Sequence, residues 1–321
     1  MTKAQVLYKA GPPDSFKWED REVGQPAAGQ VRLKHTAIGL NFAETQVRKG
    51  LRPYPLPGVI GGEGAGVITA VGQGVSGFRV GDRVAYFGPQ GSYAEERLIP
   101  ADALYLLPKG VSDEVAATSM LKGATAHYLV HRTFPVKKGH VVLYHAAAGG
   151  VGLIACQWAK HYGATVIGTV SSEDKVAVAK SHGCDHVINY KDGKFADQVK
   201  ALTGGRGANV VFDAVGVTTW DESIKSTAVF GMIVLFGNPS GDVTPEQYAR
   251  IPLDRYFIHP TLPAYMAKRE DRDKAIHDLL SAIDKGILKV EVRQRYPLKD
   301  AARAHTDLEA RRTIGASVLV P

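Results

Sequence analysis

The residues best suited to do chemistry lie in one stretch, 145–152, which reads His-Ala-Ala-Ala-Gly-Gly-Val-Gly. It follows the apolar run 141–144 and precedes apolar residues at helical spacing, and a second apolar run, 165–170, comes after. Strand, glycine turn, helix and strand form the unit that binds a dinucleotide pyrophosphate, because free N–H groups and the positive end of the helix dipole attract the anion. Gly149 lets the backbone approach the phosphates, and Gly152 lets the helix pack close to the strand. The first glycine of the usual G-x-G-x-x-G pattern is Ala147, so a plain glycine turn remains the alternative.

The end of the second strand indicates which dinucleotide binds. A cofactor with a free ribose 2′-hydroxyl usually meets an acidic side chain there, but this strand ends in Thr-Val-Ser-Ser. Ser172 and Lys175 offer a hydroxyl and an ammonium at a helix N-terminus, which suits a 2′-phosphate. We therefore expect NADPH rather than NADH. The alternative is that Ser172 is only an N-cap and Lys175 a solvated lysine, and Glu173 and Asp174 favour the same helix start through its dipole.

Length and composition set the broad class. A chain of 321 residues exceeds what one core usually supports, so we expect two domains. No apolar run reaches the ~18 residues of a membrane span, and the first residues lack the apolar core of a signal peptide. Cys156 and Cys184 are too few for a disulfide framework or a thiolate zinc site. We expect a cytoplasmic protein with no membrane partner.

The net charge of +7 comes from scattered lysines and arginines. A basic balance can indicate nucleic acid, a membrane or an anionic cofactor. No RNA-binding aromatic motif interleaves with the charges. We interpret the charge as solubility plus a phosphate-bearing ligand, and do not expect nucleic acid as a partner.

The elements around the glycine turn fall into two groups. Short strands are expected at 4–8, 30–38, 64–71, 83–86 and 93–99, separated by Gly and Pro, which is typical of a compact, barrel-like β domain. A short helix is expected at 41–50, facing a cleft. Ser112 is predicted to cap a helix over 113–131 that carries the chain into the second domain.

Strands and helices alternate from there. Strands are expected at 141–145, 165–170, 186–189, 209–213, 232–236 and 256–259. Such alternation predicts an α/β fold with a doubly wound parallel sheet. After about residue 263, helices at 271–285 and 300–309 and strands at 290–296 and 316–320 are expected to return and complete the first domain.

Three stretches carry a resemblance to a known family. They are HAAAGGVG at 145–152, which overlaps GVGLIACQWAK at 150–160; NFAE at 41–44; and YPLKDAARAH at 296–305. The sequence with these stretches resembles zeta-crystallin-type quinone oxidoreductases of the medium-chain dehydrogenase/reductase superfamily. The resemblance covers essentially the whole chain. It implies a GroES-like β-barrel catalytic domain of residues 1–122 with 263–321, a Rossmann domain of residues 123–262, and a cofactor in the cleft between them. It also implies NADPH-dependent quinone reduction, commonly in a homodimer.

The resemblance implies cofactor contacts at matched positions. Asn41 is expected near the nicotinamide ribose, with Lys122 and Thr125 beside the nicotinamide. The pyrophosphate positions are Gly149, Gly150, Val151 and Gly152, and the adenosine-phosphate positions are Ser172, Lys175 and Tyr190. Further contacts are expected at the ends of two strands, at Val215 and at Phe236, Gly237 and Asn238, and near the C-terminus at Arg311. Each has a plainer alternative: a turn or cap residue for Asn41, a loop aromatic for Tyr190, core for Phe236 and surface charge for Arg311.

Asn41, Tyr54 and His259 are the residues expected to donate hydrogen bonds to the quinone oxygens, where negative charge develops. The family's shorter acid is replaced by Glu44, and an arginine of some relatives by His259. These departures leave the substrate preference open.

No metal is expected. The positions that hold catalytic zinc in the superfamily's alcohol dehydrogenases match Asn41, Gly62 and Leu121, none of which ligates zinc well. The Lewis acid that alcohol oxidation requires is then missing. Two other functions stay open: reduction of the activated double bond of an enal or enone by the same hydride donor, and an RNA-binding or crystallin-like structural role.

Overall fold

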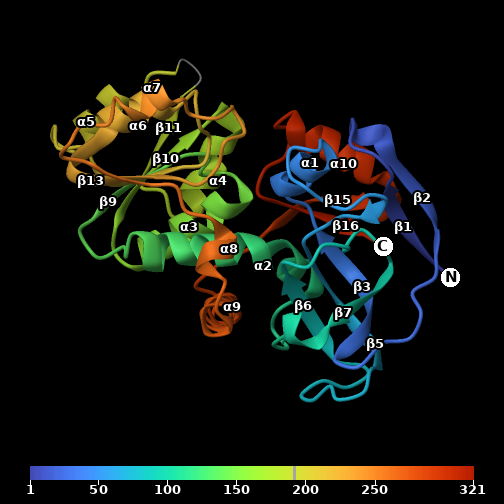
Figure 1. Cartoon of the computed structure of the whole chain (residues 1–321). Helices are drawn as coiled ribbons and strands as arrows, with labels where there is room; N and C mark the ends of the chain where they lie inside the picture. The colour runs from blue at the N-terminus through green and yellow to red at the C-terminus, as the bar shows by residue number, and fades with distance from the viewer. Residues whose placement is uncertain (191–192) are drawn as a thin grey trace. The chain divides into compact units, whose positions relative to one another are not determined.

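The computed structural model describes residues 1–190 and 193–321 (Figure 1). The chain forms two compact units: unit 1 comprises residues 1–122 and 290–321, and unit 2 comprises residues 123–289. Helix α2 (Asp113–Tyr128) runs through the boundary. Residues 263–289, expected with the first domain, group with unit 2, because α9 (Arg269–Asp284) presses Leu279 against Gly123 so closely that a Cβ there would lie 2.4 Å from the leucine methyl groups.

Unit 1 is built on two sheets. The larger has the order β15-β16-β3-β5-β6-β8, with β7 also paired to β3, and the smaller has the order β2-β1-β4. The bounds are β1 Thr2–Leu7, β2 Phe16–Arg21, β3 Gln30–Gly39, β4 Gly58–Val59, β5 Glu63–Val71, β6 Arg83–Phe87, β7 Glu96–Pro100, β8 Leu104–Leu106, β15 Val292–Pro297 and β16 Ala316–Val320. Over the described residues no pairing joins β8 to β15, so the expected closed barrel is not confirmed.

Two large clusters of apolar side chains, beside a smaller one around Val6, hold unit 1 together. One lies within the large sheet and includes Val31, Leu33 and Ile68. The other lies beneath α1 (Phe42–Arg48) and α10 (Ala301–Glu309). The C-terminal segment belongs to this unit because β16 pairs with the end of β3. Short 3-10 turns are η1 Pro13–Ser15, η2 Ala101–Ala103 and η5 Leu298–Asp300.

Unit 2 is a doubly wound parallel sheet of order β11-β10-β9-β12-β13-β14, with all five pairings parallel. The strands are β9 Val141–Tyr144, β10 Thr165–Val170, β11 His186–Asn189, β12 Ala208–Asp213, β13 Thr227–Leu235 and β14 Tyr256–Ile258. The helices are η3 Leu129–Thr133, α3 Gly150–His161, η4 Glu173–Lys175, α4 Val176–Ser181, α5 Ala196–Leu202, α6 Trp220–Ser226, α7 Pro245–Tyr248 and α8 Leu262–Tyr265. The strand order reverses between β9 and β12, and this switch point is where such sheets bind ligands.

The sequence periodicity and the structure agree closely in unit 2. The α3 helix buries Leu153, Ile154 and Trp158, which recur at helical spacing. Ser112 caps α2 as expected, because its Oγ accepts a hydrogen bond from the Val115 amide at 3.3 Å. The helix expected over 113–131 is instead α-helical to Tyr128 and then widens into the π-helical turn η3.

No helix in the described part of the chain combines the length and apolarity that a membrane crossing requires.

Candidate active site

The glycine turn lies where β9 meets α3, at the switch point of the unit 2 sheet. Gly149 is the N-cap residue of α3 and Gly150 its first residue, and no acidic side chain lies in the first turn. A Cβ on Gly152 would lie 2.5 Å from the Ala146 carbonyl oxygen, so only glycine allows this close approach. Ala146 itself has φ of 53°, a left-handed conformation that costs a non-glycine residue free energy. The turn therefore presents helix N–H groups at the place where dinucleotide-binding folds hold a pyrophosphate.

A network of buried polar side chains begins at His145, the residue before the turn. It comprises His145, Thr169, Asp213, Thr219 and Ser223, and we call it the switch-point network. His145 Nδ1 lies 2.9 Å from Thr169 Oγ1 and its Nε2 lies 2.9 Å from Ser223 Oγ. Ser223 and Thr219 both donate to the Asp213 carboxylate, at 2.7 and 2.9 Å. Burial lowers the pKa of His145, which keeps the imidazole neutral.

The end of β10 carries the residues predicted to select the nucleotide. Ser172 is the N-cap residue of η4, and Lys175 ends that turn with its Nζ 3.4 Å from the Ser171 hydroxyl. Glu173 and Asp174 between them are exposed. A hydroxyl and an ammonium at the strand end, with no carboxylate ending the strand, fit a ribose 2′-phosphate better than a 2′-hydroxyl.

Other predicted cofactor residues gather at the carboxyl ends of the same sheet. Val215 follows β12, and its amide donates to Asp213 at 2.9 Å. Phe236, Gly237 and Asn238 follow β13, and the Phe236 ring centroid lies 5.9 Å from that of Tyr144. A Cβ on Gly237 would lie 2.8 Å from the Ala214 carbonyl, which marks another close approach of two loops.

Two predicted residues of unit 2 lie at the margins of the sheet. Tyr190 follows β11 and packs, half-buried, against the cluster of Ile188 and Phe195. His259 directly follows β14, the edge strand, and is exposed.

Unit 1 contains a buried charged cluster at the start of β5. Glu63 is fully buried and its Oε1 accepts from Lys122 Nζ at 2.6 Å and from Asn41 Nδ2 at 2.9 Å. Its Oε2 accepts from the Leu121 amide at 2.8 Å. A Cβ on Gly39 would lie 2.3 Å from Glu63 Oε1, so the missing side chain at this position leaves room for the carboxylate. The structure thus brings together two predicted cofactor residues, Asn41 and Lys122, through an acid that the sequence analysis did not single out.

Glu44 lies beside this cluster on α1 and is 1% exposed. Its Oε1 accepts from the Gly62 amide at 3.0 Å. Burial, and secondarily the charge of Glu63, raise the pKa of the Glu44 carboxyl from 4.5 to about 7. Glu44 is therefore poised to gain or lose a proton near neutral pH.

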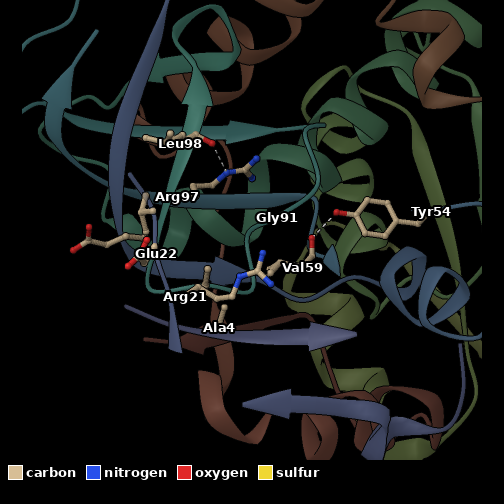
Figure 2. Close-up of a pocket in the computed structure, with 11 residues that line it drawn as sticks. Ala4, Arg21, Glu22, Tyr54, Val59, Gly91, Arg97 and Leu98 are labelled. Carbon is tan, nitrogen blue, oxygen red and sulfur yellow. Dashed lines mark hydrogen bonds between the residues drawn. The ribbon is translucent and has the colours of Figure 1, made fainter. Parts of the chain in front are cut away.

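Three predicted residues remain to be placed. Thr125 lies one turn after Lys122 on α2. Arg311 follows α10 with φ of 58° and is exposed. Tyr54 lines a surface hollow of about 310 Å³ together with Arg97, and its hydroxyl donates to the Val59 carbonyl at 2.7 Å (Figure 2). Tyr54 would have to release that bond in order to donate to a substrate.

Metal donors do not gather in either unit as the structure describes them: over residues 1–190 and 193–321, no three His, Cys, Asp or Glu side chains form a group able to hold a metal ion. Among the positions that match the zinc ligands, Asn41 supplies an amide side chain, whereas Gly62 and Leu121 have no side-chain atom that could bind a metal.

The strand order and the glycine turn define the class as a dinucleotide-binding α/β protein with a second, β-rich unit. Residues 27–109 match the family model for the alcohol dehydrogenase GroES-like domain, and residues 150–259 match that for zinc-binding dehydrogenase. A quinone oxidoreductase of Pseudomonas aeruginosa is 44% identical over all of both chains. A 2-haloacrylate reductase of a Burkholderia species is also 44% identical, over 100% of this chain and 99% of its own.

The solved structure of Escherichia coli quinone oxidoreductase complexed with NADPH has a TM-score of 0.95 to this chain. It is 41% identical and covers 99% of this chain and 100% of its own. The chain belongs to the zeta-crystallin-type quinone oxidoreductase family of the medium-chain dehydrogenase/reductase superfamily.

Proposed function

We propose that this protein is an NADPH-dependent quinone oxidoreductase that works without a metal. The observation that carries the proposal is the arrangement at the carboxyl ends of β9 and β10. There the helix N-terminus at Gly150 would bind the pyrophosphate, and the Ser172–Lys175 pair would bind the 2′-phosphate. It is supported by the E. coli relative whose structure contains NADPH.

The residues that would hold the cofactor fall into three sets. Gly149, Gly150, Val151 and Gly152 would bind the pyrophosphate through their N–H groups. Ser172, Lys175 and Tyr190 would surround the adenosine phosphate. The nicotinamide end would meet Asn41, Lys122, Thr125, Val215, Phe236, Gly237, Asn238 and Arg311. When bound, NADPH supplies a hydride at its nicotinamide ring.

The chain's own part in the reaction is orientation and charge stabilisation. Asn41 and His259, with Tyr54 as a third candidate, would donate hydrogen bonds to the quinone oxygens. Glu63 fixes both Asn41 and Lys122, and so holds two donors in one geometry. Quinones accept electrons readily, so precise placement of the reactants is the main requirement.

The experiment is NADPH oxidation measured against a panel of acceptors. We expect turnover with quinones such as 1,4-benzoquinone to exceed that with alkenals or 2-chloroacrylate, and to survive EDTA. Loss of turnover with EDTA would contradict metal-free action. Faster turnover with alkenals or 2-chloroacrylate than with quinones would show that the substrate is an activated double bond.

The nucleotide preference has its own test. We expect Lys175→Ala to weaken NADPH binding about tenfold and leave NADH binding unchanged, because one charged hydrogen bond to the 2′-phosphate contributes about 1.5 kcal/mol. Lys180→Ala, an exposed lysine on the next helix, is the control. Equal losses for both nucleotides would contradict the 2′-phosphate role.

We also propose a cytoplasmic homodimer, with the large unit 1 sheet curled in barrel-like fashion. The support for the dimer is the outer side of β14, flanked by the exposed apolar side chains of Val229, Phe230, Leu253 and Tyr256. Phe230 has φ of 58°, a strained conformation that a partner would help to maintain. Sedimentation should show a dimer for the wild type and a monomer for Phe230→Asp, whereas a wild-type monomer would exclude the assembly.

A further inference from the structure

Unit 1 contains a line of buried polar atoms that satisfy one another only in part. In the described chain, Glu44 Oε2, Ser92 Oγ, Arg48 Nε and Nη1, and His305 Nδ1 are all buried and lack a hydrogen-bond partner. Buried polar atoms without a partner are rare, and a group of them in one place needs an explanation such as internal water. We call Glu44, Arg48, Ser92, Tyr93 and His305 the polar seam.

The seam is continuous in space. The Glu44 carboxylate accepts a hydrogen bond from the Gly62 amide. The preceding residue, Gly61, packs against Ser92 and Tyr93: a Cβ on Gly61 would lie 3.0 Å from Ser92 Cβ and 2.5 Å from Tyr93 Cδ1. The Tyr93 hydroxyl lies 2.9 Å from His305 Nε2.

The far end of the seam reaches the surface of unit 1. Arg48, whose side chain is 0% exposed, donates to the Glu309 carboxylate at 2.8 Å, and that carboxylate is 18% exposed. Because a guanidinium is a fixed charge in proteins, Arg48 takes no part in proton transfer.

We propose that Glu44 is a proton-relay residue for quinone reduction, linked by internal water to the Tyr93–His305 hydrogen bond, which returns its proton. The proposal rests on the proposed function. Neither relay partner has to ionise, because a hydroxyl and a neutral imidazole can each accept one proton while giving up another.

The proton balance of the reaction requires such a donor. A quinone that takes a hydride gains two electrons and one proton and becomes a hydroquinone anion. One further proton completes the hydroquinone. Protonated Glu44 loses that proton as its O–H bond breaks, and the anion's oxygen gains it through water beside Asn41. The resulting carboxylate is reprotonated from solvent through internal water at His305 Nδ1, then through His305 and Tyr93.

The surrounding groups suit this role. Glu63 on β5 disfavours a second negative charge at Glu44, whereas Lys122 on α2 favours it. Burial raises the pKa of Tyr93 well above 10, and burial next to Arg48 lowers the pKa of His305 to about 3, so both stay neutral at pH 7. Glu44 is thus the member of the seam that exchanges a proton near neutral pH.

The decisive variant is Glu44→Gln, which keeps an oxygen for the Gly62 amide but carries no exchangeable acid. For the wild type we expect kcat with benzoquinone to fall as pH rises through about 7, because the protonated carboxyl is required. In Glu44→Gln we expect kcat to be about 100-fold lower at pH 6.5 and the decline above pH 7 to vanish. Glu44→Asp should recover part of the rate and of the decline. The control is Glu19→Gln, which changes a half-buried carboxyl bonded to Tyr8 and should behave as wild type.

Isotope effects separate a relay from a merely structural role. With NADPH deuterated at the transferred position, the primary effect on kcat should shrink toward 1 in Glu44→Gln while the solvent deuterium effect rises, because proton transfer becomes limiting. A misplaced nicotinamide would instead keep or enlarge the primary effect, and that result overturns the proposal. Tyr93→Phe, which removes only the hydroxyl, should show the same shift and provides the test if Glu44→Gln does not fold.

Failure of the relay is distinguishable from failure of the proposed function. If the wild type oxidises no NADPH with any quinone, the proposed function fails before any variant is made. If the wild type is active and Glu44→Gln keeps its pH profile and isotope effects, only the relay is wrong.

Discussion

Each unit buries a carboxylate at the end of a strand, but the two carboxylates have different surroundings. Asp213 ends β12 and receives hydrogen bonds from two backbone amides and two hydroxyl groups. Glu63 begins β5 and receives hydrogen bonds from an ammonium, an amide side chain and a backbone amide, with a second acid, Glu44, beside it. The switch-point network is neutral apart from one charge and its members satisfy one another, whereas the polar seam next to Glu63 leaves several atoms unpaired.

The difference teaches how to separate support from chemistry in a buried polar cluster. A network in which every member has a partner rigidifies the backbone around it. A cluster with unpaired atoms and closely spaced acids stores free energy that a reaction can use, and its pKa values shift accordingly. The turn above Asp213 needs to be rigid, and the region around Glu44 needs to exchange a proton.

The largest effect is expected from Glu63→Ala. Lys122, 8% exposed, would be left as a buried charge without its carboxylate, which costs about 3 to 5 kcal/mol of the free energy of unfolding. Glu96→Ala, which removes a pair with the partly exposed Arg32, should cost at most about 1 kcal/mol. Urea unfolding measures both, and equal losses would show that burial of the Glu63 pair has no consequence.

The next effect is a pH dependence of stability carried by Glu44. Its pKa is raised from 4.5 to about 7 in the folded state, so the fold binds this proton more tightly than the unfolded chain does. Its contribution to stability is fully present below about pH 4.5 and is lost as pH rises to about 7, a total of about 3 kcal/mol.

The measurement is the difference between the unfolding free energies of the wild type and Glu44→Gln from pH 4.5 to 8. Taking the difference removes the titration of all other groups. A difference that stays constant over this range would mean that Glu44 is ionised throughout.

A smaller loss, about 2 kcal/mol, is expected from Asp213→Asn. The new NH2 group would face hydrogen-bond donors such as the Val215 amide and the Thr219 hydroxyl, leaving some of them unpaired. Because the network serves support, quinone turnover should keep its decline above pH 7. A changed pH profile in this variant would contradict the division of roles between the two clusters.

The smallest effect is expected from Ser223→Ala. It removes one hydroxyl that bridges Asp213 and His145, so it should cost about 1 kcal/mol by thermal unfolding. Ser181→Ala, whose hydroxyl sits at the exposed end of α4, should change stability by less than about 0.5 kcal/mol. Indistinguishable losses would show that the network contributes little to the turn above it.

The strand, turn and helix proposed to bind the nucleotide could be predicted because they are local in sequence. Strand, turn and helix follow one another within residues 141–161. The strand and the helix are recognised by the spacing of their apolar residues, and the turn by its glycines. Strand β2 is not predicted by the sequence, because Phe16–Arg21 carries four charged residues and only one buried side chain and therefore shows no alternation. Strand β8 was missed because three residues are too few for a pattern.

The charged cluster of unit 1 could not be predicted from local patterns. Glu63 meets Lys122 across 59 positions of sequence, and neither residue stands in a motif that names its partner. Gly39 and Gly62 are the available signal, because both lack a side chain where a carboxylate packs, but nothing in the sequence states that Glu63 and Glu44 fill those spaces.

Gly39 limits how this enzyme can be altered by design. A methyl group at that position would displace the Glu63 carboxylate, and with it the anchor of Asn41 and Lys122. Mutant libraries that randomise the end of β3 should therefore lose activity almost uniformly at position 39. Shortening position 63 in the same clone should not rescue them, because the added Cβ would also lie 2.3 Å from the Ala117 carbonyl oxygen. Engineers who wish to change substrate range would do better to leave this pair untouched and diversify the exposed residue after β14, His259.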